Sequence, residues 1–210
     1  MTNQTEKETT QEDRGAERLN KKKVNMFCTA AMNYYGPECD FMSLTIIAGD
    51  GNVFYAQFTD YNAYRVDDPA GMESELLFGV DETKTCADVR ETLGIKPDDK
   101  KSCVCLGSKE DVRKLLLAWL NDIYDECSIR VVSAFSSGLY VITGLYNLFG
   151  GIKALPKCLA TGGAAILPDS LLNEVTLKWA LSKLDKELTT SQRSAITFFA
   201  ANLYKCLWQH

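Results

Sequence analysis

The chain has 210 residues, of which 46% are apolar and 24% charged, with 23 basic and 28 acidic side chains and a net charge of −5. This balance excludes a fully disordered chain and fits one domain of ordinary size. The net acidity argues against strong, sequence-independent nucleic-acid binding, and the single histidine, His210, argues against a Ser-His-Asp triad or a His-rich zinc site.

The start of the chain is polar. Residues 1–23 contain only Met1, Ala16 and Leu19 as apolar side chains, which is too few to offset the entropy lost on ordering. We therefore expect a flexible tail over 1–23 and a single domain over 24–210. No basic stub precedes an apolar block, and no run of about 18 uncharged apolar residues occurs, so we expect a cytoplasmic protein that does not engage membranes.

Eight cysteines without a secretion signal fit a reducing compartment, where thiols act as small apolar side chains. Cys103 and Cys105 form a C-x-C, but no pair of C-x-x-C knuckles exists. This spacing predicts structural thiols and no metal site. Five thiols lie in or beside apolar runs: Cys28, Cys86, Cys127, Cys158 and Cys206.

Three short runs after the tail have the composition of β-strands, at 24–31, 41–48 and 53–58. The last two are joined by Gly49-Asp50-Gly51-Asn52, whose Asp-Gly core is a strong hairpin signal. An antiparallel meander follows from this pattern. A polar, proline-containing connection over 59–82, with room for short helical turns, comes next.

Two helix starts carry capping side chains. Thr85 followed by Asp88 opens a helix that Gly94 ends, and Ser108 with Asp111 opens a longer one. Apolar residues of the longer helix recur at three and four positions and so predict one buried face. These are Val112, Leu115, Leu116, Trp119, Leu120 and Ile123.

Two further strands are expected at 102–106 and 129–134, and a helix over 138–148 that Gly150-Gly151 ends. The glycine-rich segment 151–168 lacks the residue order of a phosphate-binding loop, so we expect a plain connector there.

Two helices close the chain. Asp169 or Ser170 caps the first, and Thr189 with Gln192 forms a capping box for the second, which ends near Trp208. The second is apolar nearly all round, so it is central in the domain or covered by a partner. This property is compatible with a homodimer formed through the C-terminal helix.

A family resemblance adds to this pattern. Residues 42–61, MSLTIIAGDGNVFYAQFTDY, resemble strands two and three of bacterial and phage 3′-5′ exoribonuclease-like proteins of the DEDD group. Segments around 106–120 and 132–156 are similar to later parts of that family. The resemblance implies an α/β fold: a ribonuclease H-like mixed sheet, with three antiparallel strands and then further strands, flanked by helices.

Such exonucleases hold two divalent metals, which need several carboxylate oxygens. By the resemblance, the family's first two acids fall on Thr29 and Ala31, the third on Ala134 and the last near Ala200. None of these residues is acidic. We expect a degenerate site with no catalytic residues, no metal and no cofactor.

The expected function is that of a catalytically silent exonuclease-like domain that binds an unidentified protein partner and little or no nucleic acid. Two alternatives stay open. One is an active exoribonuclease that binds Mg²⁺ or Mn²⁺ through relocated carboxylates, drawn from Glu38, Asp40, Asp60, Asp122, Asp125 and Glu126. The other is a non-cleaving binder of single-stranded nucleic acid that stacks bases on Tyr34, Tyr35, Tyr61 and Tyr64, which we expect to lie on loops.

Overall fold

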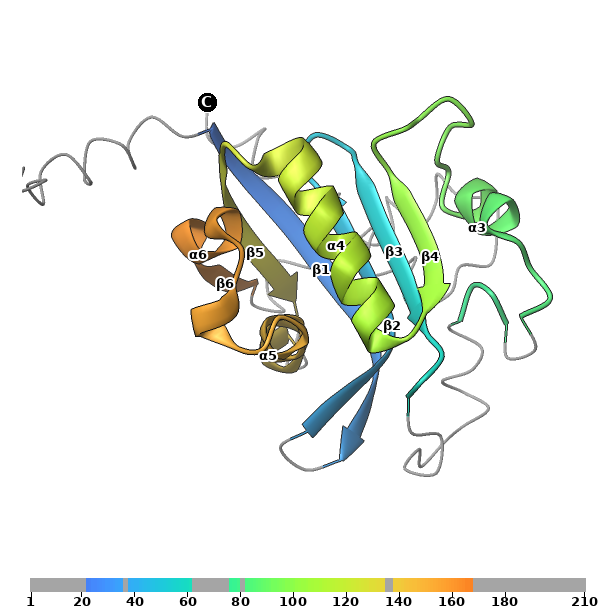
Figure 1. The fold of residues 1–210 in the computed structure, drawn as a ribbon, viewed down its shortest axis with the longest axis horizontal. Helices are drawn as coiled ribbons and strands as arrows, with labels where there is room; N and C mark the ends of the chain where they lie inside the picture. The colour runs from blue at the N-terminus through green and yellow to red at the C-terminus, as the bar shows by residue number, and fades with distance from the viewer. Residues whose placement is uncertain (1–21, 36–37, 62–75, 80–81, 135–137, 168–210) are drawn as a thin grey trace, which may run out of the picture.

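The computed structural model describes residues 22–35, 38–61, 76–79, 82–134 and 138–167 (Figure 1). The expected N-terminal tail up to residue 21 and the two C-terminal helices lie outside these ranges. Among the helices within them, none has the length and apolar character needed to cross a membrane.

A six-stranded mixed sheet forms the centre of the molecule, in the order β4-β3-β2-β1-β5-β6. β1, β2 and β3 pair antiparallel, as the hairpin signal predicts, whereas β5 runs parallel to β1, β6 parallel to β5, and β4 parallel to β3. This is an α/β fold with a ribonuclease H-like arrangement, which confirms the predicted fold class. The strands are β1 (Lys22–Tyr35), β2 (Glu38–Ala48), β3 (Val53–Phe58), β4 (Cys103–Gly107), β5 (Cys127–Ala134) and β6 (Ala164–Leu167).

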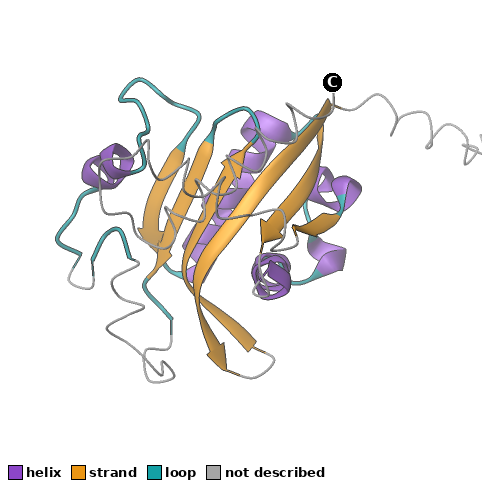
Figure 2. Cartoon of the chain, turned by 180° about the vertical axis from the view of Figure 1, so that it is seen from behind, coloured by secondary structure: helices purple, strands orange, loops and turns teal. Residues whose placement is uncertain are grey.

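Most of the helices lie on one face of the sheet. α4 (Lys109–Tyr124), α5 (Gly138–Leu148) and α6 (Lys157–Gly162) lie on one face, with the short 3-10 turn η2 (Ile152–Ala154) between the last two (Figure 1). α3 (Cys86–Thr92) lies beside β4, and Figure 2 shows the sheet from its other side, in front of the three helices.

The largest apolar cluster lies between the sheet and α4 to α6. Alternate residues of the strands point into it, because successive side chains of a strand face opposite sides. Members include Met26, Cys28, Leu44, Phe54 and Ile129, each at most 1% exposed. A smaller cluster on the opposite face joins Tyr55 to Leu77, Phe78 and Val89 of α3.

The local start and stop signals form as predicted. Thr85 and Asp88 make a complete capping box, and the Ser108 hydroxyl accepts from the Asp111 backbone N–H. Gly94 takes a φ of 71° at the end of α3, a left-handed conformation that glycine adopts at little cost. These predictions succeed because each depends on residues only three positions apart.

The first two strands are longer than predicted. β1 begins at Lys22 and continues past a bulge between Ala31 and Met32, and its far end stays paired with β2 as far as Tyr35 and Glu38. This end protrudes from the sheet as a two-stranded ribbon (Figure 1). Tyr34 and Tyr35 therefore lie in a strand, and the prediction that they lie on a loop is wrong.

The segment 151–168 is not the plain connector that its glycines suggested. It contains η2, α6 and the edge strand β6. Gly162 packs so closely on the backbone of Ile129 in β5 that a Cβ atom there would overlap the Ile129 carbonyl group. The glycine serves close approach of α6 to the sheet, which is a long-range requirement that local sequence does not reveal.

Two predictions for individual side chains are corrected. Leu115 lies on the outer side of α4 and is 44% exposed, whereas Tyr124, absent from the predicted face, is 1% exposed. Cys86, predicted to lie in or beside an apolar run, is exposed as the first residue of α3.

Replacement of Gly162 with Ala is expected to lower the free energy of unfolding by about 3 kcal/mol, because the backbones of α6 and β5 must separate. Gly94→Ala is the matched control. Gly94→Ala should lower the free energy of unfolding by only about 1 kcal/mol, the cost of placing alanine in a left-handed backbone conformation, because no atom lies within 4 Å of the Cβ position. Urea unfolding of both variants checks this; equal losses would contradict the close approach.

Candidate functional site

The structure places three of the four predicted site positions on two neighbouring strands. Thr29 and Ala31 lie on β1, and Ala134 ends β5. The parallel register runs up to the pair Phe27 and Val132, so Thr29 and Ala134 each stand two residues beyond it on adjacent strands. Ala200 lies outside the described residues.

Ala31 occupies an apolar pocket of the sheet. It is 2% exposed and packs with Met42 and Leu76, with Tyr61 at the edge of the cluster. A carboxylate at this position would lose its hydration and face apolar side chains, which is costly for a charged group. The surroundings of Ala31 are thus mainly apolar, with Ser43 opposite it on β2.

Hydroxyl groups of β2 lie beside the two β1 positions. Thr45 pairs across the sheet with Thr29, and Ser43 pairs with Ala31. Ser43 and Thr45 are at most 1% exposed, yet their side-chain oxygens make no hydrogen bond. Ser43 lies near the Tyr55 phenol without reaching hydrogen-bonding geometry. Sequence reasoning did not single out this pair, although polar residues at alternate positions of an apolar strand were a usable signal.

The neighbouring strand β3 carries polar groups that do find partners. The Gln57 carbonyl oxygen accepts from Phe78 N–H at 3.1 Å, and its amide donates to the Gly79 carbonyl at 3.2 Å. The Tyr55 phenol accepts from Leu77 N–H at 3.1 Å. Burial raises the pKa of Tyr55 to about 12. Gln57 and Tyr55 thus fix the segment 76–79 on this face of the sheet.

The thiol nearest the predicted site is inert. Cys28 is fully buried on the other face of β1, and burial raises the pKa of its thiol to about 12. Its backbone carbonyl accepts a hydrogen bond from the Ser133 hydroxyl of β5 at 2.8 Å. A neutral, enclosed thiol of this kind cannot serve as a nucleophile or as a metal ligand.

The carboxylates considered as relocated ligands lie mainly on the surface. Asp122, Asp125 and Glu126 are exposed at the end of α4 and the turn after it, and the side chain of Glu38 lies outside the described set. Asp40 and Asp60 come together at the other end of α4, where both bind Lys109. Asp40 pairs with the Lys109 ammonium, and the Asp60 carboxylate accepts from the Lys109 backbone N–H at 3.1 Å.

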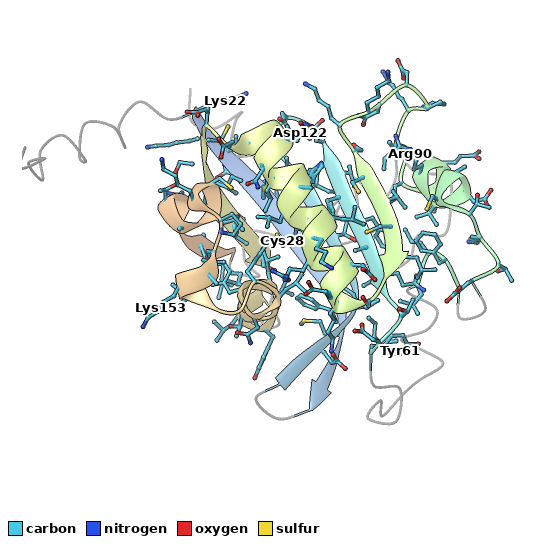
Figure 3. All side chains as sticks on the ribbon, viewed as in Figure 1. Lys22, Cys28, Tyr61, Arg90, Asp122 and Lys153 are labelled. Atoms are coloured by element: carbon cyan, nitrogen blue, oxygen red, sulfur yellow. The ribbon has the colours of Figure 1, made fainter. Side chains whose placement is uncertain are left out.

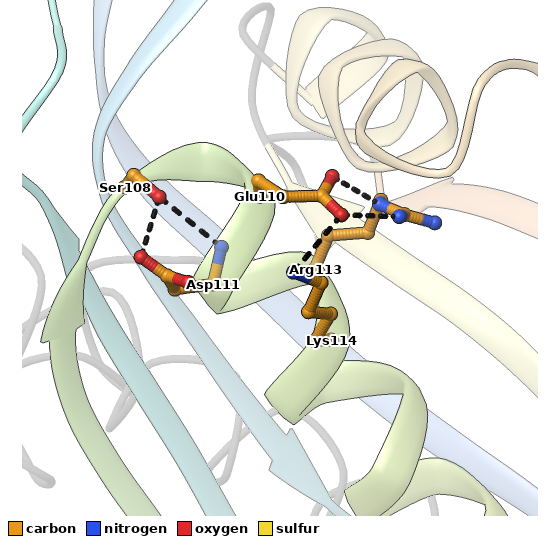
Figure 4. Close-up of polar contacts among 5 residues, drawn as sticks. All are labelled: Ser108, Glu110, Asp111, Arg113 and Lys114. Atoms are coloured by element: carbon orange, nitrogen blue, oxygen red, sulfur yellow. Dashed lines mark hydrogen bonds and ion pairs between the residues drawn. The ribbon is translucent and has the colours of Figure 1, made fainter.

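The first turn of α4 holds its charges in local pairs (Figure 4). Glu110 accepts from Arg113 at 2.7 and 3.0 Å, and Lys114 approaches the same carboxylate at 3.4 Å. The Arg113 guanidinium lowers the pKa of Glu110. Taken over the residues that the structure describes, His, Cys, Asp and Glu side chains form no group of three that could hold a metal ion.

A depression of about 340 Å³ lies between the β2–β3 turn and the loop before β4, lined among others by Asp50, Asn52, Lys96 and Asp99. Its acids are engaged by the protein. Asp50 accepts from the Tyr124 phenol at 2.9 Å, and Asp99 accepts from the Ser102 hydroxyl at 2.6 Å. We therefore interpret this depression as a place where two loops are held together by hydrogen bonds, and not as a binding site.

Comparison with known proteins adds no assignment. No protein-family model matches the chain, and no curated protein is significantly similar to it.

Thr45→Val is expected to raise the free energy of unfolding by about 1 kcal/mol, because it removes a buried hydroxyl that has no partner and keeps the shape of the side chain. Gln57→Met is the contrasting variant, with an expected loss of about 2 kcal/mol, since Phe78 N–H and the Gly79 carbonyl lose their partner. Urea unfolding measures both. A destabilised Thr45→Val protein would show that the hydroxyl is satisfied.

We expect the hydrogen bonds of Asp99 to make the stability of the fold depend on pH. The Ser102 hydroxyl has the largest effect and lowers the pKa of Asp99; burial opposes it, and the N–H groups of Lys101 and Ser102 and the charge of Arg90 lower it further. Its folded pKa lies below the unfolded one, so its contribution to stability is complete above the unfolded pKa and is lost as pH falls through the folded pKa. The stability difference between the wild type and Asp99→Asn should be largest near neutral pH and should shrink in acid. A difference that stays constant in unfolding experiments down to acidic pH would contradict this.

Proposed function

We propose that the chain is a catalytically silent 3′-5′ exonuclease-like domain that works as a protein-interaction or regulatory module. The observation that carries the proposal is the packing of Ala31 against Met42 and Leu76 on the central strand of a ribonuclease H-like sheet. By the resemblance in the sequence, this position belongs to an acid in active relatives. Here it is 2% exposed among apolar side chains.

The chemistry of a two-metal nuclease supports the same proposal. Two divalent cations that clamp the attacking and leaving oxygens require several carboxylate ligands. Thr29 and Ala134, which lie on neighbouring strands, can offer only hydroxyl and backbone oxygens. Replacing clustered acids with neutral side chains also removes their mutual repulsion and so stabilises a sheet that holds no metal.

An active exonuclease is the second candidate, and one observation favours it. Asp40 and Asp60 are distant in sequence, yet both bind Lys109. If the Lys109 ammonium moved away, the carboxylates of Asp40 and Asp60 would be free to bind a cation in its place. We prefer the proposal of an inactive domain, because the ion pair with Lys109 neutralises Asp40 and the Lys109 backbone N–H binds the Asp60 carboxylate.

Charge supports a protein partner over nucleic acid. Leaving out the six basic and five acidic residues of 1–23, the remainder of the chain carries 17 basic and 23 acidic side chains. Such a surface repels a polyanion at distances below the Debye length. Affinity for a random oligonucleotide at physiological salt should therefore be poor, and sub-micromolar binding would favour the nucleic-acid-binding alternative.

The direct test is digestion of 3′-labelled single-stranded RNA and DNA by the full chain with Mg²⁺ or Mn²⁺. We expect no metal-dependent release of nucleotides, and no rise of the melting temperature when either metal is added. Asp40→Asn and Asp60→Asn should leave this background unchanged, as should the matched surface control Glu110→Gln. Robust digestion that both aspartate variants abolish and the control retains would overturn the proposal in favour of the active enzyme.

A further inference from the structure

Two cysteines of the edge strand β4 form a cluster that the proposed function does not use. Cys103 and Cys105 are two residues apart, so their side chains point to the same face, toward the core under α4. Cys105 is 7% exposed, whereas Cys103 is only partly buried. Cys103 is therefore the more accessible of the two thiols, and the buried Cys105 lies next to it on the same face of β4.

The spacing of the two residues is compatible with a covalent bond between them. Residues two apart on an extended strand are separated by about 6.6 Å between Cα atoms. Disulfides span about 4.4–6.8 Å, so this pair lies near the upper limit. β4 has a strand neighbour on one side only in the described sheet, and an edge strand can bend to bring the sulfurs together.

Polar groups around the pair favour ionisation of the outer thiol. The Cys105 thiol donates to the Tyr55 carbonyl oxygen at 3.7 Å and is a close neighbour of the Cys103 thiol. The neighbouring Cys105 thiol lowers the pKa of Cys103, and the positive charge of Arg90 acts in the same direction against the effect of burial. The neighbouring Cys103 thiol, together with burial, raises the pKa of Cys105.

Arg90 is fixed in the position from which it acts. Its guanidinium donates to the Ser102 carbonyl at 2.8 Å, to the Lys96 carbonyl at 3.4 Å, and to the Asp99 carbonyl. It extends from α3 toward the start of β4, where Cys103 follows Ser102 (Figure 3). Its three hydrogen bonds go to carbonyl oxygens, so the guanidinium acts as a positive charge on both the Asp99 carboxylate and the Cys103 thiol.

We propose that Cys103 and Cys105 are an oxidation site for small peroxides, in which Cys103 is the attacking thiolate and Cys105 is the resolving thiol. The other described cysteines lack this combination. Cys28, Cys127 and Cys158 are buried, and Cys86 is exposed on α3.

The reaction balances with hydrogen peroxide as the oxidant. The Cys103 thiolate attacks one peroxide oxygen, the O–O bond breaks, and the leaving hydroxide takes up a proton to give water. Cys103 is then a sulfenic acid. The Cys105 sulfur attacks the Cys103 sulfur, the S–S bond forms, and the hydroxyl group leaves with the Cys105 proton as a second water. The two sulfurs lose two electrons in total, and these reduce the peroxide.

The product should be easily reduced. The two Cβ atoms must approach within about 3.5–4.5 Å, so the strand has to bend where Cys103 pairs with Phe54 and Cys105 with Ala56. A strained disulfide has a higher reduction potential than an unstrained one. Dithiothreitol should therefore restore both thiols of the folded chain.

The test treats the reduced full chain with hydrogen peroxide and maps the modified cysteines by alkylation and peptide mass spectrometry. We expect a Cys103–Cys105 disulfide, seen as the loss of two hydrogen atoms from the peptide that contains both residues. In Cys105→Ser the reaction should stop at a Cys103 sulfenic acid that dimedone traps. In Cys103→Ser oxidation of Cys105 should slow at least about tenfold, because the buried thiol ionises poorly.

Cys86→Ser is the matched control, because it removes the exposed thiol of α3, which is not on β4 with Cys103 and Cys105. It should form the Cys103–Cys105 bond at the wild-type rate. Three results would overturn the proposal: preferential oxidation of Cys86, a disulfide between other cysteines, or unchanged oxidation in Cys103→Ser. If a serine variant fails to fold, the mapping of the wild-type chain still decides which thiols react.

Discussion

The pairing of β1 on both of its edges is the constraint on which the rest of the structure depends. β1 runs antiparallel to β2 from Met26 to Tyr35 and parallel to β5 from Lys22 to Phe27, and the Ser133 hydroxyl adds a bond to the Cys28 carbonyl. Met26 and Phe27 are paired on both edges and are at most 5% exposed, so a charged side chain there would lose its hydration. Uncharged side chains at this point of β1 are therefore a requirement of the sheet itself.

The surroundings of Cys28 and Cys103 shift the pKa values of their thiols in opposite directions. At the centre of the sheet, burial alone acts on Cys28 and raises the pKa of its thiol to about 12. At the edge, a neighbouring thiol and the fixed guanidinium of Arg90 lower the pKa of Cys103 in spite of its partial burial. The centre of the sheet thus holds its thiol unreactive, while the edge supplies a charged partner and access to solvent.

Features that depend on neighbours in sequence could be predicted, and features that depend on distant packing could not. The boundaries of β3 and α5, the Thr85 capping box and the end of α3 at Gly94 follow from short-range rules. The strand β6 was missed because its only signal, the pair Gly162-Gly163, reads locally as a loop. Its real cause is contact between α6 and β5.

In the candidate site, too, some features follow from the fold class, whereas others depend on contacts between distant segments. Thr29 and Ala134 lie on the neighbouring strands β1 and β5, an arrangement that follows from the strand order of the fold class. The resemblance could not predict that Leu76 covers Ala31, because that contact joins β1 to a segment 45 positions later in the chain. The convergence of Asp40 and Asp60 on Lys109 was equally hidden, because it requires β2, β3 and α4 to meet.

Lys109 also has a mechanical consequence. Asp40 lies on the part of β2 that extends past the bulge, so its ion pair fastens the base of the protruding ribbon to the start of α4. The Lys109 side chain is 45% exposed, and ions in solution weaken such a contact. A rise in ionic strength should therefore loosen the attachment of the two-stranded ribbon to α4.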